Sequence, residues 1–243
     1  MKLQNLIKKI SRFFTLSVIY AVCATTYMSV KGFVYEDGKI FLANTAQAQD
    51  DTKSFAKPAE KHVLINLSNP HFLGDENAPL TLYEYSSFGC THCADFHLST
   101  IKKLEDEYIK TGKLKIILVY FPIDKKSMQA AMIASCIPDE EYHAFVDTVF
   151  KKQREWSLSN KAIEVLSEYA SFHGISKLTA LECTKNDKIA SEILGNRQQG
   201  MNEFQINGTP TFVVDDGKKQ EIIPGAPSFS ALKKYLDEKL QNI

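Results

Sequence analysis

The feature that most constrains this chain is a pair of cysteines at the point where a predicted strand is followed by a predicted helix. The apolar and aromatic run from Leu80 to Ser86 is typical of a strand. Gly89 breaks the run. The motif Cys90-Thr91-His92-Cys93 then opens a segment whose apolar residues recur every three or four positions to about residue 110. The sequence therefore predicts two cysteines within the first turn of a helix.

A CxxC motif in this position favours a reactive thiolate. Unpaired backbone N–H groups and the helix dipole stabilise negative charge at Cys90, and the thiolate is the form that attacks disulfides. The same spacing occurs in zinc sites, but no second CxxC or paired-histidine motif is present to complete one. We expect a redox pair, with Cys90 as the exposed nucleophile and Cys93 as its buried partner, and neither metal nor other cofactor. A purely structural disulfide is the remaining alternative.

The charge of the chain separates an N-terminal segment from the rest. Residues 1–48 contain six lysines and arginines against two acidic residues, so they carry +4 and the remainder −4, because the 243-residue chain is formally neutral. The basic start and the uncharged run from Phe13 to Val30 are typical of a secretory signal, with a cleavage motif at Ala46-Gln47-Ala48. We assign 1–48 to a signal peptide or, alternatively, an uncleaved N-terminal anchor. Neutrality gives no indication of nucleic-acid binding.

The remaining cysteines fit an exported protein. If Cys23 leaves with the signal, Cys90, Cys93, Cys136 and Cys183 remain, an even number compatible with two disulfides in an oxidising compartment. We expect a structural disulfide between Cys136 and Cys183. Two buried free thiols are the alternative.

The order of the predicted elements indicates an α/β domain. Residues 49–79 form an N-terminal arm with a short strand predicted at His62–Leu67. A second strand at Lys115–Phe121 follows the CxxC helix, and strand, helix and strand in this order favour a parallel pair. The pattern is helical over about 125–205. Two further strands then flank the hairpin signal Asp216-Gly217, and an amphipathic helix ends the chain. We therefore predict one domain over 80–243 with an inserted α-helical subdomain.

Two stretches resemble the DsbA-like branch of the thioredoxin family. The first runs from Gly74 to Leu80 and on to the CxxC motif, and the second is Asn207–Val214, which contains Gly208-Thr209-Pro210. The resemblance covers roughly residues 63–242. It implies a thioredoxin-like fold with an inserted helical subdomain, and thiol-disulfide oxidoreductase activity in the periplasm.

The resemblance also implies roles for particular residues. In this family the Thr209-Pro210 peptide is expected to be cis and to lie beside the sulfurs, where the backbone of Thr209 pairs with a substrate chain. His92 is expected to stabilise the thiolate, whereas Thr91 replaces the proline often found before that histidine. Glu84 is expected to carry a proton to Cys93.

Each of these roles has a simpler alternative. His92 is otherwise an exposed residue at a helix start, and Glu84 an ordinary strand glutamate. We assign His97 to the surface or to packing. Trp156 and its apolar neighbours in the insertion are assigned to a core rather than to a substrate cleft. These neighbours are Met128, Met132 and Phe145.

We therefore expect an oxidase that donates the Cys90–Cys93 disulfide to exported, unfolded proteins with free thiols. The resemblance implies reoxidation by a DsbB-like membrane partner, and we expect a monomer. A reductase or isomerase that uses the same cysteines is one alternative. A periplasmic chaperone-like binding module, which captures unfolded chains beside Pro210, is another.

Overall fold

The computed structural model describes residues 33–36, 39–42, 55–68 and 70–243. The chain divides into two units between Lys53 and Ser54. The basic start, the apolar run, Cys23 and the Ala46-Gln47-Ala48 motif all lie outside the described residues. Within the described ranges, no helix is long and apolar enough to cross a membrane.

The described part of the first unit is an antiparallel hairpin of β1 (Phe33–Glu36) and β2 (Lys39–Leu42). This hairpin was not predicted, because residues 1–48 were assigned as a whole to the signal or anchor. A hairpin pattern is nevertheless present in the sequence. Asp37-Gly38 separates two short runs rich in β-branched and aromatic residues, which is a strong hairpin pattern.

The second unit is built on a six-stranded sheet with the order β3-β8-β7-β5-β6-β4. β5 (Leu80–Ser86) pairs in parallel with β6 (Leu114–Tyr120) and antiparallel with β7 (Thr211–Asp215). This confirms the predicted parallel pair. β8 (Gln220–Pro224) follows β7 through a tight turn in which Gly217 has φ +79°, as the hairpin signal predicted.

The two outer strands come from the N-terminal arm. β3 (Lys57–Pro58) pairs with β8 and β4 (Phe72–Leu73) pairs with β6. The strand predicted at His62–Leu67 is wrong, since this segment joins no ladder. Instead the side-chain amide of Gln220 accepts from the N–H of Val63 and donates to its C=O, both at 2.8 Å. A distant side chain thus satisfies the backbone that the local pattern assigned to a strand.

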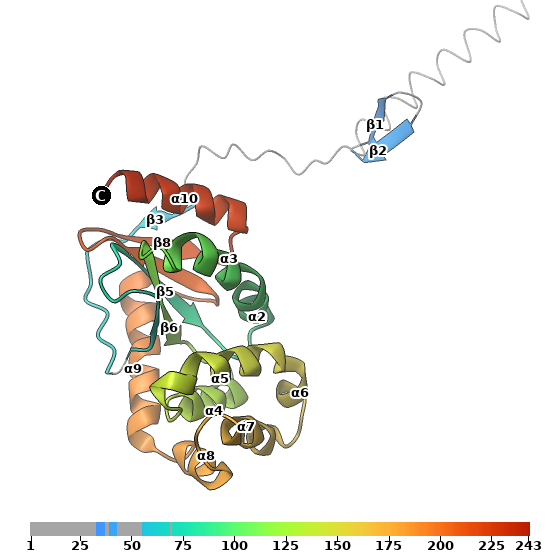
Figure 1. The fold of residues 1–243 in the computed structure, drawn as a ribbon, viewed down its shortest axis with the longest axis vertical. Coiled ribbons are helices and arrows are strands. Elements are labelled where there is room, and N and C mark those ends of the chain that lie inside the picture. Colours follow the sequence, from blue (N-terminus) through green and yellow to red (C-terminus); the bar gives the residue numbers. More distant parts are fainter. Residues whose placement is uncertain (1–32, 37–38, 43–54, 69) are drawn as a thin grey trace, which may run out of the picture. The chain divides into compact units, whose positions relative to one another are not determined.

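Helices cover both faces of the sheet (Figure 1). One face packs against the CxxC helical segment and α10 (Phe229–Gln241), through a core that includes Phe96, Phe212 and Leu236. The other face packs against the end of α9 (Asp187–Phe204) through Tyr85 and Phe204. The CxxC segment begins with α2 (Thr91–Phe96) and continues through helical turns to Ile109. These turns are His97–Ile101, α3 (Lys102–Leu104) and Glu105–Ile109.

The predicted helical insertion is confirmed, and its helices α4 to α8 gather at one end of the sheet (Figure 1). They have their own core, in which Trp156, Phe145 and Met132 are buried and Met128 is partly buried. The assignment of these residues to a core is therefore correct. The bounds are α4 Lys125–Ala134, α5 Asp139–Lys151, α6 Gln153–Ser157, α7 Ala162–Ser171 and α8 Lys177–Cys183.

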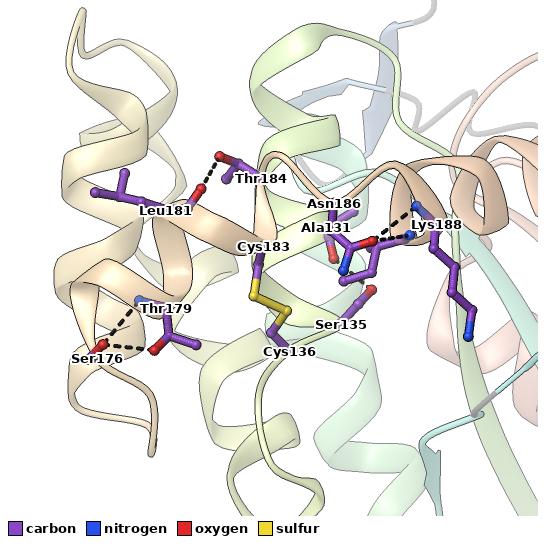
Figure 2. The surroundings of a disulfide bond; sticks show 11 residues. Ala131, Ser135, Cys136, Ser176, Thr179, Leu181, Cys183, Thr184, Asn186 and Lys188 are labelled. Carbon is purple, nitrogen blue, oxygen red and sulfur yellow. Dashed lines mark hydrogen bonds between the residues drawn. A yellow bond between two sulfur atoms is a disulfide. The ribbon is translucent and has the colours of Figure 1, made fainter.

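A disulfide cross-links this helical region. Cys136, just after α4, is bonded to Cys183, the last residue of α8, as Figure 2 shows. The two residues are 47 positions apart in sequence. The cross-link therefore closes a loop that contains α5, α6 and α7 as well as α8.

We expect the double substitution Cys136→Ser/Cys183→Ser to lower the free energy of unfolding by roughly 3–4 kcal/mol, because the unfolded chain regains the entropy of a loop of about 50 residues. Denaturant unfolding of the oxidised protein measures this difference. Cys90 and Cys93 are left intact, so their redox titration serves as an internal control for native structure. An unchanged unfolding midpoint would show that the helical region does not depend on its cross-link.

Candidate active site

The central strand β5 leads directly into the cysteine motif. After Ser86 the chain turns, and the N–H of Cys90 donates to the carbonyl of Ser87 at 3.0 Å. Cys90 is the N-cap of α2, and its Sγ accepts from the N–H of Cys93 at 3.3 Å. Gly89 meets the insertion here, because a Cβ at this position would lie 2.9 Å from Oδ2 of Asp124, the N-cap of α4. A larger residue at this position would have to displace the carboxylate of Asp124.

The two sulfurs have opposite electrostatic environments. The pKa of Cys90 is lowered from 9.0 to about 5, chiefly by a hydrogen bond from the Cys93 side chain. Burial opposes this shift, and hydrogen bonds from the Thr209 side chain and from the backbone at Cys93 and His92 support it. The pKa of Cys93 is raised, first because its side chain is fully buried. Cys90 is therefore the thiolate, and Cys93 is the proton donor beside it. The expectation that Cys90 is exposed is wrong, since Cys90 is only 8% exposed, whereas Cys93 is buried as expected.

The predicted peptide-binding loop faces the same sulfur. The Thr209-Pro210 peptide is cis, and Sγ of Cys90 lies 3.3 Å from the carbonyl oxygen of Thr209. Gly225 donates to the carbonyl of Pro210 at 2.9 Å and so ties the loop to the end of β8. Because β7 follows this loop and pairs with β5, the sheet itself sets the distance between the loop and the cysteines.

Glu84 lies inside the protein on β5, two positions before Ser86. Its side chain is 1% exposed, and its Oε1 has no hydrogen-bond partner among the described residues. Burial raises the pKa of its carboxyl, while the charge of His97 and the hydroxyl of Ser86 oppose this rise. The Ser86 hydroxyl also lowers the pKa of Cys93, so it lies close to both groups. A buried carboxyl with a raised pKa is suited to hold and release a proton.

His92 and His97 make different contacts at the active site. His92 is exposed, and it supports the Cys90 thiolate through its backbone. The role predicted for its imidazole stays a prediction. His97 packs as expected, with its ring 4.7 Å from that of Phe150, and its Nε2 also lies 2.6 Å from Oδ1 of Asp147. Thr91 is exposed at the helix start.

One functional contact was missed by the sequence analysis. The side chain of Gln153, from the helical insertion, donates to the carbonyls of Phe88 and Cys90. A glutamine in a helix gives no sequence signal for such a contact with residues more than 60 positions away. Among the described residues, no group of three or more His, Cys, Asp or Glu side chains is arranged to hold a metal ion.

A reactive thiolate at a helix start, a buried partner thiol and a cis-proline loop together define a thioredoxin-fold thiol-disulfide oxidoreductase. The chain belongs to the thioredoxin family, since the family model described as thioredoxin matches residues 66–238.

Comparison with individual proteins identifies the DsbA-like branch. A protein of Rickettsia bellii named as a protein-disulfide oxidoreductase is 28% identical over 176 residues, 72% of this chain and 68% of the relative. Disulfide bond formation protein D of Bacillus subtilis is 23% identical over 175 residues, 70% of this chain and 76% of the relative. The crystal structure of alpha-DsbA1 from Wolbachia pipientis matches with a TM-score of 0.67 and 28% identity, covering 74% of this chain and 94% of that one. The protein is a DsbA-type thiol-disulfide oxidoreductase.

The hydrogen bond from Cys93 can be tested with a matched pair of variants. We expect Cys93→Ala to move the pKa of Cys90 from about 5 toward 9, because the donor is lost. Cys93→Ser keeps a hydroxyl donor and should leave the titration midpoint low. The ultraviolet absorbance of the thiolate, followed against pH, gives both midpoints. Equal midpoints in the two variants would contradict this origin of the shift.

The lowered pKa of Cys90 also makes the stability of the reduced protein depend on pH. A group whose pKa is lower in the folded than in the unfolded state stabilises the fold above its unfolded pKa, and this stabilisation is lost as the pH falls toward the folded value. Relative to Cys90→Ala, the reduced protein should therefore lose the contribution of Cys90 as the pH falls from 9.0 to about 5. Denaturant unfolding of both proteins at several pH values measures the difference.

Proposed function

We propose that this protein is an oxidase that donates its Cys90–Cys93 disulfide to exported proteins during their folding. The observation that supports this direction is the difference between the two sulfurs, with the pKa of Cys90 near 5 and that of Cys93 raised. Groups that stabilise the Cys90 thiolate stabilise the reduced enzyme. A stable reduced form makes the corresponding disulfide a stronger oxidant.

The reaction begins when a substrate thiolate attacks Sγ of Cys90 in the oxidised enzyme. A bond forms between the substrate sulfur and Cys90, the Cys90–Cys93 bond breaks, and Cys93 leaves as a thiolate. A second substrate thiolate then attacks the substrate sulfur of this mixed disulfide, and Cys90 leaves. Two electrons have passed from the substrate dithiol to the enzyme. Cys90 is a good leaving group because its thiolate is stable near pH 5 and above.

Glu84 completes the proton balance in this proposal. Cys93 has a raised pKa and takes up a proton after it leaves, and Glu84 is the buried carboxyl near it. In the reverse direction, when the enzyme is reoxidised, Glu84 accepts that proton. Burial raises the pKa of this carboxyl, which favours its protonated form.

The Thr209-Pro210 loop is proposed to align the substrate. Proline has no backbone N–H, so Pro210 presents no hydrogen-bond donor of its own to a chain that lies beside Cys90. The carbonyl of Thr209 lies close to Sγ of Cys90 and can accept from an extended peptide laid against the loop. A substrate paired in this way presents its cysteine sulfur to Cys90.

We further propose an exported, periplasmic location, a monomeric state and reoxidation by a DsbB-like membrane partner. The Cys136–Cys183 disulfide supports the location, because such bonds persist in oxidising compartments. The basic and apolar character of residues 1–30 supports export. Reoxidation follows from the electron balance, since each turnover leaves the enzyme reduced.

The direction of electron transfer is tested by the reduction potential of the Cys90–Cys93 couple. Equilibration with glutathione should give about −120 mV, as for an oxidising DsbA type, rather than about −270 mV, as for a thioredoxin. Cys136→Ser/Cys183→Ser serves as the control that isolates this couple. A value near that of thioredoxin would overturn the oxidase proposal and favour a reductase.

The substitution Cys90→Ser separates an enzyme from a chaperone-like binding module. It should abolish oxidation by an enzyme, whereas a chaperone-like module would still suppress aggregation.

The proton role of Glu84 predicts a kinetic effect. Glu84→Gln keeps the size of the side chain and removes the titrating group, so we expect disulfide donation to a dithiol peptide to slow by about tenfold or more near neutral pH. The pH dependence of the rate should flatten as well. Stopped-flow measurement of the reaction tests both effects. If Glu84→Gln reacts at the wild-type rate with an unchanged pH profile, Glu84 is a structural residue.

A further inference from the structure

The active-site turn is held from outside the thioredoxin framework by one side chain. Gln153 lies at the start of α6 in the helical region and is only 5% exposed. Its Nε2 donates one hydrogen to the carbonyl of Phe88 at 2.7 Å and the other to the carbonyl of Cys90 at 2.9 Å. Both donors of the amide are therefore used on the backbone of the turn that ends at the reactive cysteine.

The two acceptors lie on either side of Gly89, the most flexible residue of the turn. The ring of Phe88 lies 5.0 Å from that of Phe150, and this packing fixes one side. On the other side the carbonyl of Cys90 also accepts from the N–H of Ala94 at 3.2 Å, a hydrogen bond of the first turn of α2. Gln153 thus fixes the Phe88–Gly89 peptide plane and the Cys90–Thr91 peptide plane, at which the redox helix begins.

This arrangement bears directly on the sulfur of Cys90. Cys90 has φ −85° and ψ 121°, and in this conformation its Sγ accepts from the N–H of Cys93. A rotation of the Cys90 peptide plane would weaken that hydrogen bond. The amide of Gln153 also offsets the negative ends of two carbonyl dipoles close to Cys90. Without these donors, the carbonyls would disfavour a thiolate beside them.

We propose that Gln153 is a positioning residue for thiol-disulfide exchange, through which the helical region helps to set the reactivity of Cys90. The proposal rests on the redox activity of the CxxC pair but not on the direction of electron transfer. It assigns the insertion a part in the chemistry, in addition to any part in binding substrates.

Three variants test this role. Gln153→Met removes both donors at nearly constant volume, and Gln153→Ala removes the same donors and leaves a cavity. We expect both to raise the pKa of Cys90 by the same amount and to lower the equilibrium constant for glutathione reduction of the Cys90–Cys93 disulfide about tenfold, or about 30 mV. Their unfolding free energies should differ, because only Gln153→Ala loses packing.

Gln220→Met is the matched control. Gln220 is also buried, and its Nε2 also donates to two acceptors, the carbonyl of Val63 and a carboxylate oxygen of Asp215, both at 2.8 Å. We expect this variant to lose stability with no change in the Cys90 titration.

Two results would overturn the proposal. The first is an unchanged Cys90 titration in a folded Gln153 variant. The second is a shift that follows loss of stability across all three variants, which would give Gln153 a structural role only. Each comparison is made with the unsubstituted protein. A parent potential near that of thioredoxin would therefore overturn the oxidase proposal and leave the test of Gln153 intact.

Discussion

The active site is organised by the start of one helix, where the backbone N–H of Cys93 donates to the sulfur of Cys90. This arrangement requires that the strand ends, that the turn forms and that the helix begins, all within a few residues. The apolar and aromatic run of β5 forms the strand, Gly89 permits the close turn, and Cys90 caps the helix with its own side chain. The residue that caps the N-terminus of the helix is also the residue that carries the reactive sulfur. The fold therefore cannot form α2 without also placing hydrogen-bond donors at the sulfur.

Much of this arrangement could be predicted from the sequence, because it is encoded locally. The strand at 80–86, the helix after Cys90 and the Asp216-Gly217 turn each carry a pattern within a short window, and the structure contains all three. The disulfide between Cys136 and Cys183 was expected from the even number of cysteines that remain without Cys23, with two free thiols as the alternative, and the structure contains the bond.

The features that could not be predicted from the sequence depend on partners far away in the chain. β3 and β4 are two residues long, and only pairing with β8 and β6 makes them strands. The segment at 62–67 has a strand-like composition, but Gln220 satisfies the backbone of Val63. Gln153 belongs to the same class, since nothing near it in sequence indicates contact with Phe88 or Cys90. A side-chain amide that takes the place of a backbone hydrogen-bond partner leaves no periodic pattern in the sequence.

Because β7 pairs with β5, the position of the cis-proline loop and the reactivity of Cys90 depend on different parts of the structure. The strand that follows the cis-proline loop and the strand that leads to Cys90 are joined by backbone hydrogen bonds, which do not depend on side-chain identity. The reactivity of the sulfur depends instead on side chains around it, such as Cys93, Thr209 and Glu84. Substitutions at those positions can therefore change the reactivity of Cys90 while the backbone pairing that positions the cis-proline loop stays in place. Such a scaffold allows thiol-disulfide oxidoreductases of different reduction potential to evolve on one backbone.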